Sequence, residues 1–199
     1  MQTTLILIRH GITDWNRQKI YCGYTDVCLS NKGKIQAARL SQRLKSVNFD
    51  RVYSSDRKRA LQTARIIFDA ARITRVKDLR EINFGVFEGL SYKEIIKKYR
   101  AVHEKWMKDP FKNVIPKAEA LYTFKKRINS VIKKIVRVNR GKTVAVVCHG
   151  GTIGMFITSI LKKKRFWRYV PNAASISIVE FKENKPRIKI FNDTSHLNV

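Results

Sequence analysis

Cysteines, acidic side chains and long apolar runs are all scarce in this 199-residue chain. The three cysteines, Cys22, Cys28 and Cys148, are odd in number and lack metal-ligand spacing, so we expect reduced thiols. No apolar stretch approaches the ~20 residues that span a bilayer, which argues against a transmembrane helix. The N-terminus also lacks the basic region of a signal peptide. We therefore expect a cytoplasmic protein with no membrane partner.

Acidic residues number only 15 against 42 Lys and Arg, which gives a formal charge of +27 at pH 7. Such a charge attracts nucleic acid, acidic membranes or phosphorylated metabolites. The excess is nearly uniform, since residues 1–100 carry 21 Lys and Arg against 9 Asp and Glu, and residues 101–199 carry 21 against 6. Because there is no basic tail, we favour a small phosphorylated partner over nucleic acid. We interpret the densest cluster, residues 162–165, as a solvated helix end.

Helical and strand patterns alternate along most of the chain, which is typical of βαβ units. The sequence therefore predicts one α/β domain over residues 1–199, a three-layer α/β/α sandwich with a mainly parallel sheet. We also expect a small cap-like insertion at about residues 82–120. Helices are predicted after Ser30, after a capping Asp56, and over 91–99, 102–108, 119–138 and 152–161. Strands are predicted at 4–9, 51–54, 74–77, 143–148, 175–181 and 187–191, the last two forming a hairpin with a turn at Asn184.

Two histidines directly follow two of the predicted strands. Arg9-His10-Gly11 ends the first strand, and His149-Gly150 follows the fourth. Continuous apolar runs of this length are typical of buried parallel strands, and ligands lie beyond the carboxyl ends of such strands. A neutral imidazole is a usable nucleophile near neutral pH, and an adjacent arginine can neutralise phosphoryl oxygens. The pattern predicts phosphoryl transfer through a phosphohistidine.

Other short motifs lie in a fixed order between and beyond these two histidines. They are Thr13-Asp14-Trp15-Asn16, Gly23-Tyr24-Thr25-Asp26, Tyr53-Ser54-Ser55-Asp56, Arg59-Ala60, Thr63-Ala64, the stretch 79–89, and Asn192-Asp193-Thr194-Ser195-His196. With these motifs the chain resembles the histidine phosphatase superfamily, also called the phosphoglycerate mutase-like family. Within that family it is most similar to α-ribazole phosphatases and related small bacterial phosphatases.

The resemblance implies a role for each matching residue. His10 matches the nucleophile, and Glu81 matches the general acid that protonates the leaving oxygen and later activates water. Arg9, Arg59 and His149 match the remaining catalytic members of the phosphate pocket. Glu88 and Glu119 are the alternatives to Glu81 as the acid. The implied phosphate- and substrate-binding set comprises Arg9, Asn16, Gly23, Arg59, Glu81, His149 and Gly150.

We predict a phosphomonoesterase that acts on small phosphorylated metabolites, with α-ribazole 5′-phosphate as a candidate substrate. No metal or other cofactor is expected, because no Asp/His cluster has metal-ligand spacing. The alternatives are a bisphosphate-dependent phosphoglycerate mutase and a non-catalytic, polyanion-binding relative. Departures from the family pattern at Ile12, Cys22 and residues 117–120 leave the alcohol half of the substrate open. The sequence is compatible with a monomer or a homodimer.

Overall fold

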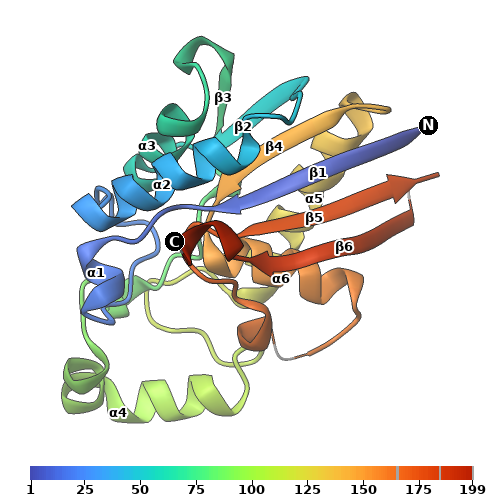
Figure 1. The fold of residues 1–199 in the computed structure, drawn as a ribbon. Helices are drawn as coiled ribbons and strands as arrows, with labels where there is room; N and C mark the ends of the chain where they lie inside the picture. The colour runs from blue at the N-terminus through green and yellow to red at the C-terminus, as the bar shows by residue number, and fades with distance from the viewer. Residues whose placement is uncertain (165, 184, 199) are drawn as a thin grey trace.

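A single six-stranded sheet runs through the computed structural model, which describes residues 1–164, 166–183 and 185–198 (Figure 1). The strand order is β3-β2-β4-β1-β5-β6, and β5 runs antiparallel to its two neighbours, β1 and β6, while the other five strands run in one direction. The predicted mainly parallel sheet is therefore confirmed; Arg165 and the predicted turn residue Asn184 lie outside the described residues. The strands are β1 (Gln2–Arg9), β2 (Arg51–Ser55), β3 (Ile73–Val76), β4 (Thr143–Cys148), β5 (Ile176–Lys182) and β6 (Lys185–Asp193).

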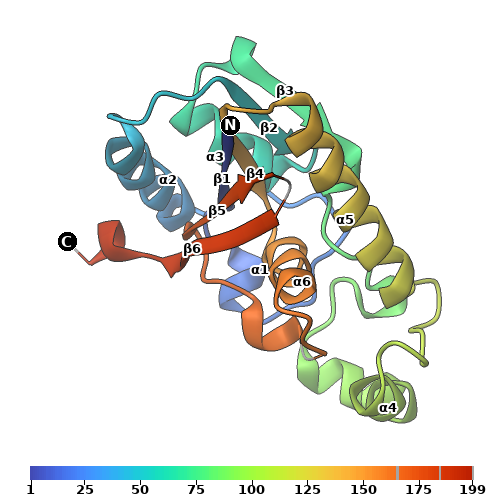
Figure 2. The same cartoon turned by 90° about the vertical axis from the view of Figure 1, so that its right-hand side faces the viewer.

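Helices cover both faces of this sheet, as the sequence predicts (Figure 2). One face carries α2 (Asn31–Leu44) and α3 (Lys58–Ile67), and the other carries α5 (Leu121–Val138) and α6 (Gly150–Ile160). Side chains alternate across a strand, so the consecutive apolar residues of β1 supply two separate cores. Leu5 and Leu7 belong to the core beneath α5 and α6. Ile6 and Ile8 belong to the core beneath α2 and α3.

The segment between β3 and α5 contains α4 (Tyr92–Lys108), which lies away from the sheet (Figure 1). A capping box between Ser91 and Glu94 begins this helix. The two predicted helices are joined across a kink at Tyr99, whose φ and ψ are −139° and 31°. Trp106 anchors α4 through an edge-on contact with Phe87, with 6.3 Å between ring centroids. Within the described ranges, no helix is long and apolar enough to cross a bilayer.

Short elements complete the described fold. A capping box between Thr13 and Asn16 begins α1 (Asp14–Arg17). The basic cluster after α6 is exposed at Lys162, Lys163 and Lys164, in agreement with a solvated helix end. Single 3-10 turns are found at Ala70–Arg72, Lys77–Leu79, Gly85–Phe87, Phe166–Tyr169 and Ser195–Leu197.

The prediction that Asp56 caps a helix is wrong. The N-cap of α3 is Arg57, and no side chain caps this helix. The carboxylate of Asp56 instead accepts both Nε and Nη2 of Arg80, the residue before Glu81. A bidentate, charge-assisted pair is stronger than one capping hydrogen bond, which explains the different partner. The pair links the carboxyl end of β2 to the loop that carries Glu81.

Candidate active site

The two histidines predicted at one sheet edge lie side by side. Strands β1 and β4 are parallel neighbours, and Arg9 pairs in register with Cys148. The next residues, His10 and His149, therefore leave the sheet together, and their ring centroids are 5.2 Å apart. Their residues are only 3% and 0% exposed. The backbone N–H of His10 donates to the carbonyl of Cys148 at 3.0 Å, which holds the two strand ends in this register.

The ring of His10 is held in an orientation that suits a nucleophile. Its Nδ1 lies 2.7 Å from the carbonyl oxygen of Gly11. Because a carbonyl only accepts, Nδ1 must carry the proton, and Nε2 keeps its lone pair. Burial, followed by the charges of Arg59 and Arg9, holds the pKa of His10 well below 6.5. The imidazole is therefore neutral near neutral pH, with Nε2 able to attack phosphorus.

The ring of His149 forms a hydrogen bond through one of its two nitrogens. Its Nε2 lies 2.8 Å from Ser55 Oγ, which itself accepts the backbone N–H of Arg57 at 3.4 Å. When the hydroxyl donates its hydrogen to Nε2, the ring proton of His149 lies on Nδ1. Nδ1 is buried and has no hydrogen-bond partner among the described residues. Burial, with Arg59 as the largest charge, also holds the pKa of His149 well below 6.5.

Two buried arginines bring positive charge to the same place. Arg59, only 1% exposed, comes from the first turn of α3 and donates to the carbonyls of Gly23 at 2.7 Å and Thr25 at 2.9 Å. Arg9 donates to the carbonyl of Pro171, and its Nε is buried without a partner in the described part of the chain. Each guanidinium has five N–H donors, so both retain donors for phosphoryl oxygens.

Glu81 reaches the site from the loop after β3. Its Oε2 accepts the backbone N–H of Gly151 at 2.7 Å, and its Oε1 accepts that of Ile82 at 3.0 Å. A Cβ atom at residue 151 would lie 2.4 Å from Oε1, so this approach requires glycine. Burial raises the pKa of Glu81, against the lowering by both hydrogen bonds and by Arg59 and Arg9. The raised pKa favours a carboxyl group that carries a proton to donate.

Glu88, one alternative acid, has a structural environment instead. Its carboxylate accepts the backbone N–H groups of Gly23, Tyr24, Thr25 and Phe84 at 2.8–3.1 Å, and the hydroxyl of Thr25 at 2.6 Å. These bonds hold the pKa of Glu88 below its usual value although burial raises it. Glu88 thus clamps the loop whose carbonyls hold Arg59. Sequence reasoning missed this role because the loop is more than 60 residues away in the chain.

Glu119, the other alternative, supports the loop of Glu81. It forms a bidentate pair with Arg127, with N–O distances of 2.9 and 2.7 Å. Arg127 also donates to the carbonyls of Asp78, Arg80 and Glu81. The ion pair is largely buried and fixes the backbone on both sides of the candidate acid. Arg127 was not a sequence candidate, since its position on the otherwise wet face of α5 gives no signal.

The remaining predicted residues border the pocket in different ways. Asn16 uses its carbonyl oxygen to accept the backbone N–H of Thr13 at 3.1 Å, so the two hydrogens of its NH2 group are not used in this bond. Gly150 begins α6, and a Cβ there would lie 3.1 Å from the guanidinium carbon of Arg9. Gly23 contributes its carbonyl to Arg59, as described above. Glycine at residue 150 thus allows Arg9 to pack against the helix N-terminus.

The carboxyl end of β6 supports Arg9 through a short relay. Asn192, with a φ of 58°, accepts the backbone N–H of Asn172 on its Oδ1 at 2.7 Å. The preceding residue, Pro171, supplies the carbonyl that holds the Arg9 guanidinium. The side chain of Asn192 therefore fixes the peptide segment on which the orientation of Arg9 depends.

His196 supports the backbone of His10 in a similar way. Its Nε2 lies 3.0 Å from the carbonyl of Ala174 and donates to it, because a carbonyl only accepts. The N–H of Ala174 donates in turn to the carbonyl of His10 at 3.1 Å. The Asn192–His196 motif thus contacts the loop that borders the site, although the sequence assigns it no chemical role.

Taken together, the buried side chains of His149, Arg59 and Arg9 lie close to the His10 ring, and the carboxyl group of Glu81 lies close to both arginines. This arrangement can bind a phosphoryl group and stabilise the charge on its equatorial oxygens. Among the residues that the structure describes, no three His, Cys, Asp or Glu side chains converge as metal ligands. Independence from metal ions stays a prediction.

Comparisons with known proteins agree with this geometry. Phosphoserine phosphatase 1 of Hydrogenobacter thermophilus is 31% identical over 97% of this chain and 93% of its own length. A phosphoserine phosphatase from Entamoeba histolytica, solved with 3-phosphoglyceric acid, superposes with a TM-score of 0.88 at 29% identity, covering 98% and 99% of the two chains. A putative α-ribazole-5′-P phosphatase from Escherichia coli has a TM-score of 0.89 over 96% of each chain, but its 23% identity supports the fold alone. The family model of the histidine phosphatase superfamily, branch 1, matches residues 5–194. The chain therefore belongs to the histidine phosphatase superfamily, and it is a phosphatase.

Proposed function

We propose that this phosphatase hydrolyses small phosphomonoesters through a phosphohistidine on Nε2 of His10. The observation that carries the proposal is the hydrogen bond from Nδ1 of His10 to the carbonyl of Gly11. This bond fixes the tautomer of His10, so the lone pair of Nε2 lies on the side of the ring away from the carbonyl of Gly11. Arg9, Arg59 and His149 then supply the positive charge and donors that a transferring phosphoryl group needs.

The reaction proceeds in two steps, phosphorylation of His10 and hydrolysis of the phosphohistidine. Nε2 of His10 attacks phosphorus, the P–O bond to the alcohol breaks, and the Glu81 carboxyl proton passes to the leaving oxygen. Water then attacks the phosphohistidine, Glu81 takes a proton from that water, and the P–N bond breaks to release inorganic phosphate. Neutral His10 and protonated Glu81 are restored. The raised pKa of Glu81 and the lowered pKa of His10 both favour this starting state.

For the substrate, we rank phosphoserine ahead of α-ribazole 5′-phosphate. A phosphoserine phosphatase is 31% identical to this chain, whereas a putative α-ribazole phosphatase is a 23% identical structural neighbour. We also propose that residues 82–120, the predicted cap-like insertion that contains α4, cover the pocket and contact the alcohol half. A mutase would share the first step and pass the phosphoryl group to a second alcohol instead of water.

A panel of phosphorylated metabolites tests this proposal. Phosphoserine, α-ribazole 5′-phosphate and 3-phosphoglycerate are each incubated with the protein, and inorganic phosphate and isomeric phosphate esters are measured. We expect phosphate release to be fastest from phosphoserine. Conversion of 3-phosphoglycerate to its 2-phospho isomer faster than any phosphate release, with bisphosphoglycerate present, supports the mutase instead. Salt-dependent polyanion binding without turnover of any ester supports the non-catalytic alternative.

A further inference from the structure

The acidic residues of the chain are absent from a long stretch that includes the helices on one face of the sheet. From residue 120 to residue 179 the sequence contains no Asp or Glu but 13 Lys and Arg. This stretch includes α5, the buried strand β4 and α6, so the two helices that cover this face of the sheet contain no acidic residue (Figure 2). A comparison of the two halves of the chain does not reveal this stretch, because the halves have similar net charges. Exposed cations of α5 and its end include Lys126, Lys133, Lys134, Arg137 and Arg140.

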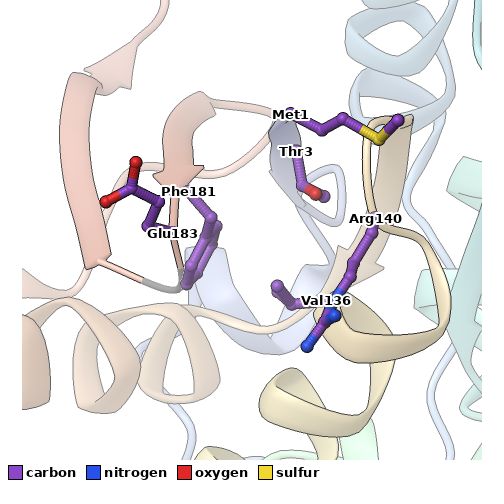
Figure 3. Close-up of a pocket in the computed structure, with 6 residues that line it drawn as sticks. All are labelled: Met1, Thr3, Val136, Arg140, Phe181 and Glu183. Carbon is purple, nitrogen blue, oxygen red and sulfur yellow. The ribbon is translucent and has the colours of Figure 1, made fainter.

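A groove runs along this face between α5 and the end of β5. It consists of three cavities with volumes of about 310, 350 and 260 Å³, all lined by Phe181. Two of the cavities share Lys133, and two share Val136 and Arg140, so they form one continuous feature, here named the α5 groove. Figure 3 shows one of the cavities, with Phe181 and Arg140 on opposite sides of it.

The rim of the α5 groove is cationic. It carries Lys125, Lys133, Arg137 and Arg140, and none of these forms an ion pair with another described residue. Lys133 and Arg137 are one helical turn apart, a rise of about 6 Å along the helix axis. Of the described residues lining the groove, only Glu183 is acidic. A linear polyanion with regularly spaced charges complements such a rim.

The floor of the groove is apolar and contains an aromatic ring. The half-buried ring of Phe181 stacks on that of Phe156, with centroids 6.5 Å apart and planes 21° apart. Because Phe156 is buried, its contact restrains the Phe181 ring, which also lines all three cavities. A fixed aromatic ring between cations is the arrangement on which single-stranded nucleic acids stack their bases.

We propose that the α5 groove binds single-stranded nucleic acid, with phosphates on its rim and a base against Phe181. A duplex hides its base faces, and a membrane requires apolar side chains that protrude instead of lining a recess. The groove is remote from the catalytic edge, since Phe181 pairs with Thr3 while His10 follows the other end of β1. At ~3.3 Å per residue, this separation is roughly 23 Å. At this separation, nucleic acid in the α5 groove leaves the catalytic edge accessible, so binding and catalysis are not alternatives.

Fluorescence anisotropy with a labelled single-stranded RNA tests this proposal. The probe is about 20 nucleotides long, which exceeds the roughly 4–16 nucleotides that one small domain covers. Binding is measured between about 50 and 200 mM salt for the wild type and for a Lys133→Ser/Arg137→Ser/Arg140→Ser variant. We expect the triple variant to bind at least about tenfold more weakly. The slope of the logarithm of its binding constant against the logarithm of the salt concentration should become shallower by about 2, since each lost phosphate contact removes roughly 0.7.

A matched variant controls for net charge. Lys34→Ser/Lys45→Ser/Arg65→Ser removes three exposed cations from α2, its C-cap and α3, on the opposite face, and should bind RNA within about threefold of wild type. Both triple variants should retain phosphomonoester hydrolysis. Phe181→Leu should weaken binding to the single strand while leaving the salt slope unchanged. Equal loss in both triple variants overturns the proposal, as does tighter binding to a duplex of the same length or to anionic phospholipid vesicles.

Discussion

The carboxyl group of Glu81 and the imidazole of His10 are buried in the same pocket, and burial moves their pKa values in opposite directions. Burial raises the pKa of Glu81 and lowers that of His10, because both groups lose the hydration that favours their charged forms. Both shifts favour a protonated acid and an unprotonated nucleophile. Shifts in these directions are what a general acid and a nucleophile in one site require.

Replacement of Glu81 by Gln should slow the hydrolysis of alkyl phosphates by about 10²–10⁴-fold. The amide cannot donate a proton to the poor alkoxide leaving group. For p-nitrophenyl phosphate, which releases a stabilised phenolate, phosphorylation of His10 should slow much less. Rapid-mixing measurement of the nitrophenol burst separates that step from the later water attack. Equal slowing of phosphorylation with both substrates contradicts the role of Glu81.

The pH dependence of alkyl phosphate hydrolysis by the wild type is a further test of Glu81 and His10. Rates should fall as the pH rises through the raised pKa of Glu81, because the acid loses its proton. They should remain high below pH 6.5, because the pKa of His10 lies well below that value. We therefore expect kcat/KM for an alkyl phosphate to be highest on the acidic side of neutral. An optimum above pH 8 contradicts this assignment of acid and nucleophile.

Among the elements, those fixed by continuous apolar runs can be predicted from sequence. The run before His10 and the run before His149 predict adjacent parallel strands, and the two rings meet at the expected edge. Local rules fail where a distant partner competes. Asp56 pairs with Arg80 instead of capping α3, and Glu88 binds a loop more than 60 residues away. No local pattern contains information about those contacts.

The end of β6 provides a prediction at the scale of elements. Asn192→Gly removes the side-chain acceptor but tolerates the φ of 58°, so it isolates the hydrogen bond to Asn172. Loss of a bond of about 0.5–1.5 kcal/mol should weaken the hold on Pro171 and Arg9. We expect vanadate, a phosphate mimic, to bind about 2–10-fold more weakly in isothermal titration calorimetry. Asn192→Asp keeps an acceptor oxygen and should bind like the wild type.

A double-mutant cycle separates positioning of Arg9 from general loosening of the fold. If Asn192 acts through Arg9, then Asn192→Gly should cause little further loss of vanadate affinity in an Arg9→Ala background. Additive losses in the double variant indicate that Asn192 does not position Arg9. Thermal unfolding of all four proteins shows whether the comparison is made between folded chains.

Across the whole molecule, three histidines are held with lowered pKa values: His10, His149 and His196. Burial is the largest cause for each, so the unfolded chain takes up protons more readily than the folded one. Their contribution to stability is fully present above the ordinary pKa of 6.5 and is lost as the pH falls below it. Each such proton changes the free energy of unfolding by up to about 1.4 kcal/mol per pH unit.

Urea unfolding measured at about pH 7.5, 6.5 and 5.5 checks this prediction. We expect the free energy of unfolding to fall towards acid pH, although Glu81 opposes the trend because its pKa is raised. His149→Gln should reduce the pH dependence of the free energy of unfolding by the equivalent of up to one proton, which is about 1.4 kcal/mol per pH unit. This holds whatever the substitution does to stability at neutral pH. If the free energy of unfolding rises as the pH is lowered from about 6.5 to 5.5, the histidines do not dominate its pH dependence.

Detection of the phosphoryl group on His10 tests the central claim most directly. The protein is mixed with radiolabelled phosphoserine, quenched in alkali, which preserves phosphohistidine, and its peptides are analysed by mass spectrometry. We predict label on the peptide that contains His10 and none in His10→Ala, whose turnover should lie below ~1% of wild type. That loss corresponds to a barrier increase of at least about 2.7 kcal/mol. Turnover above ~1% of wild type in His10→Ala, or label on another residue, contradicts the mechanism.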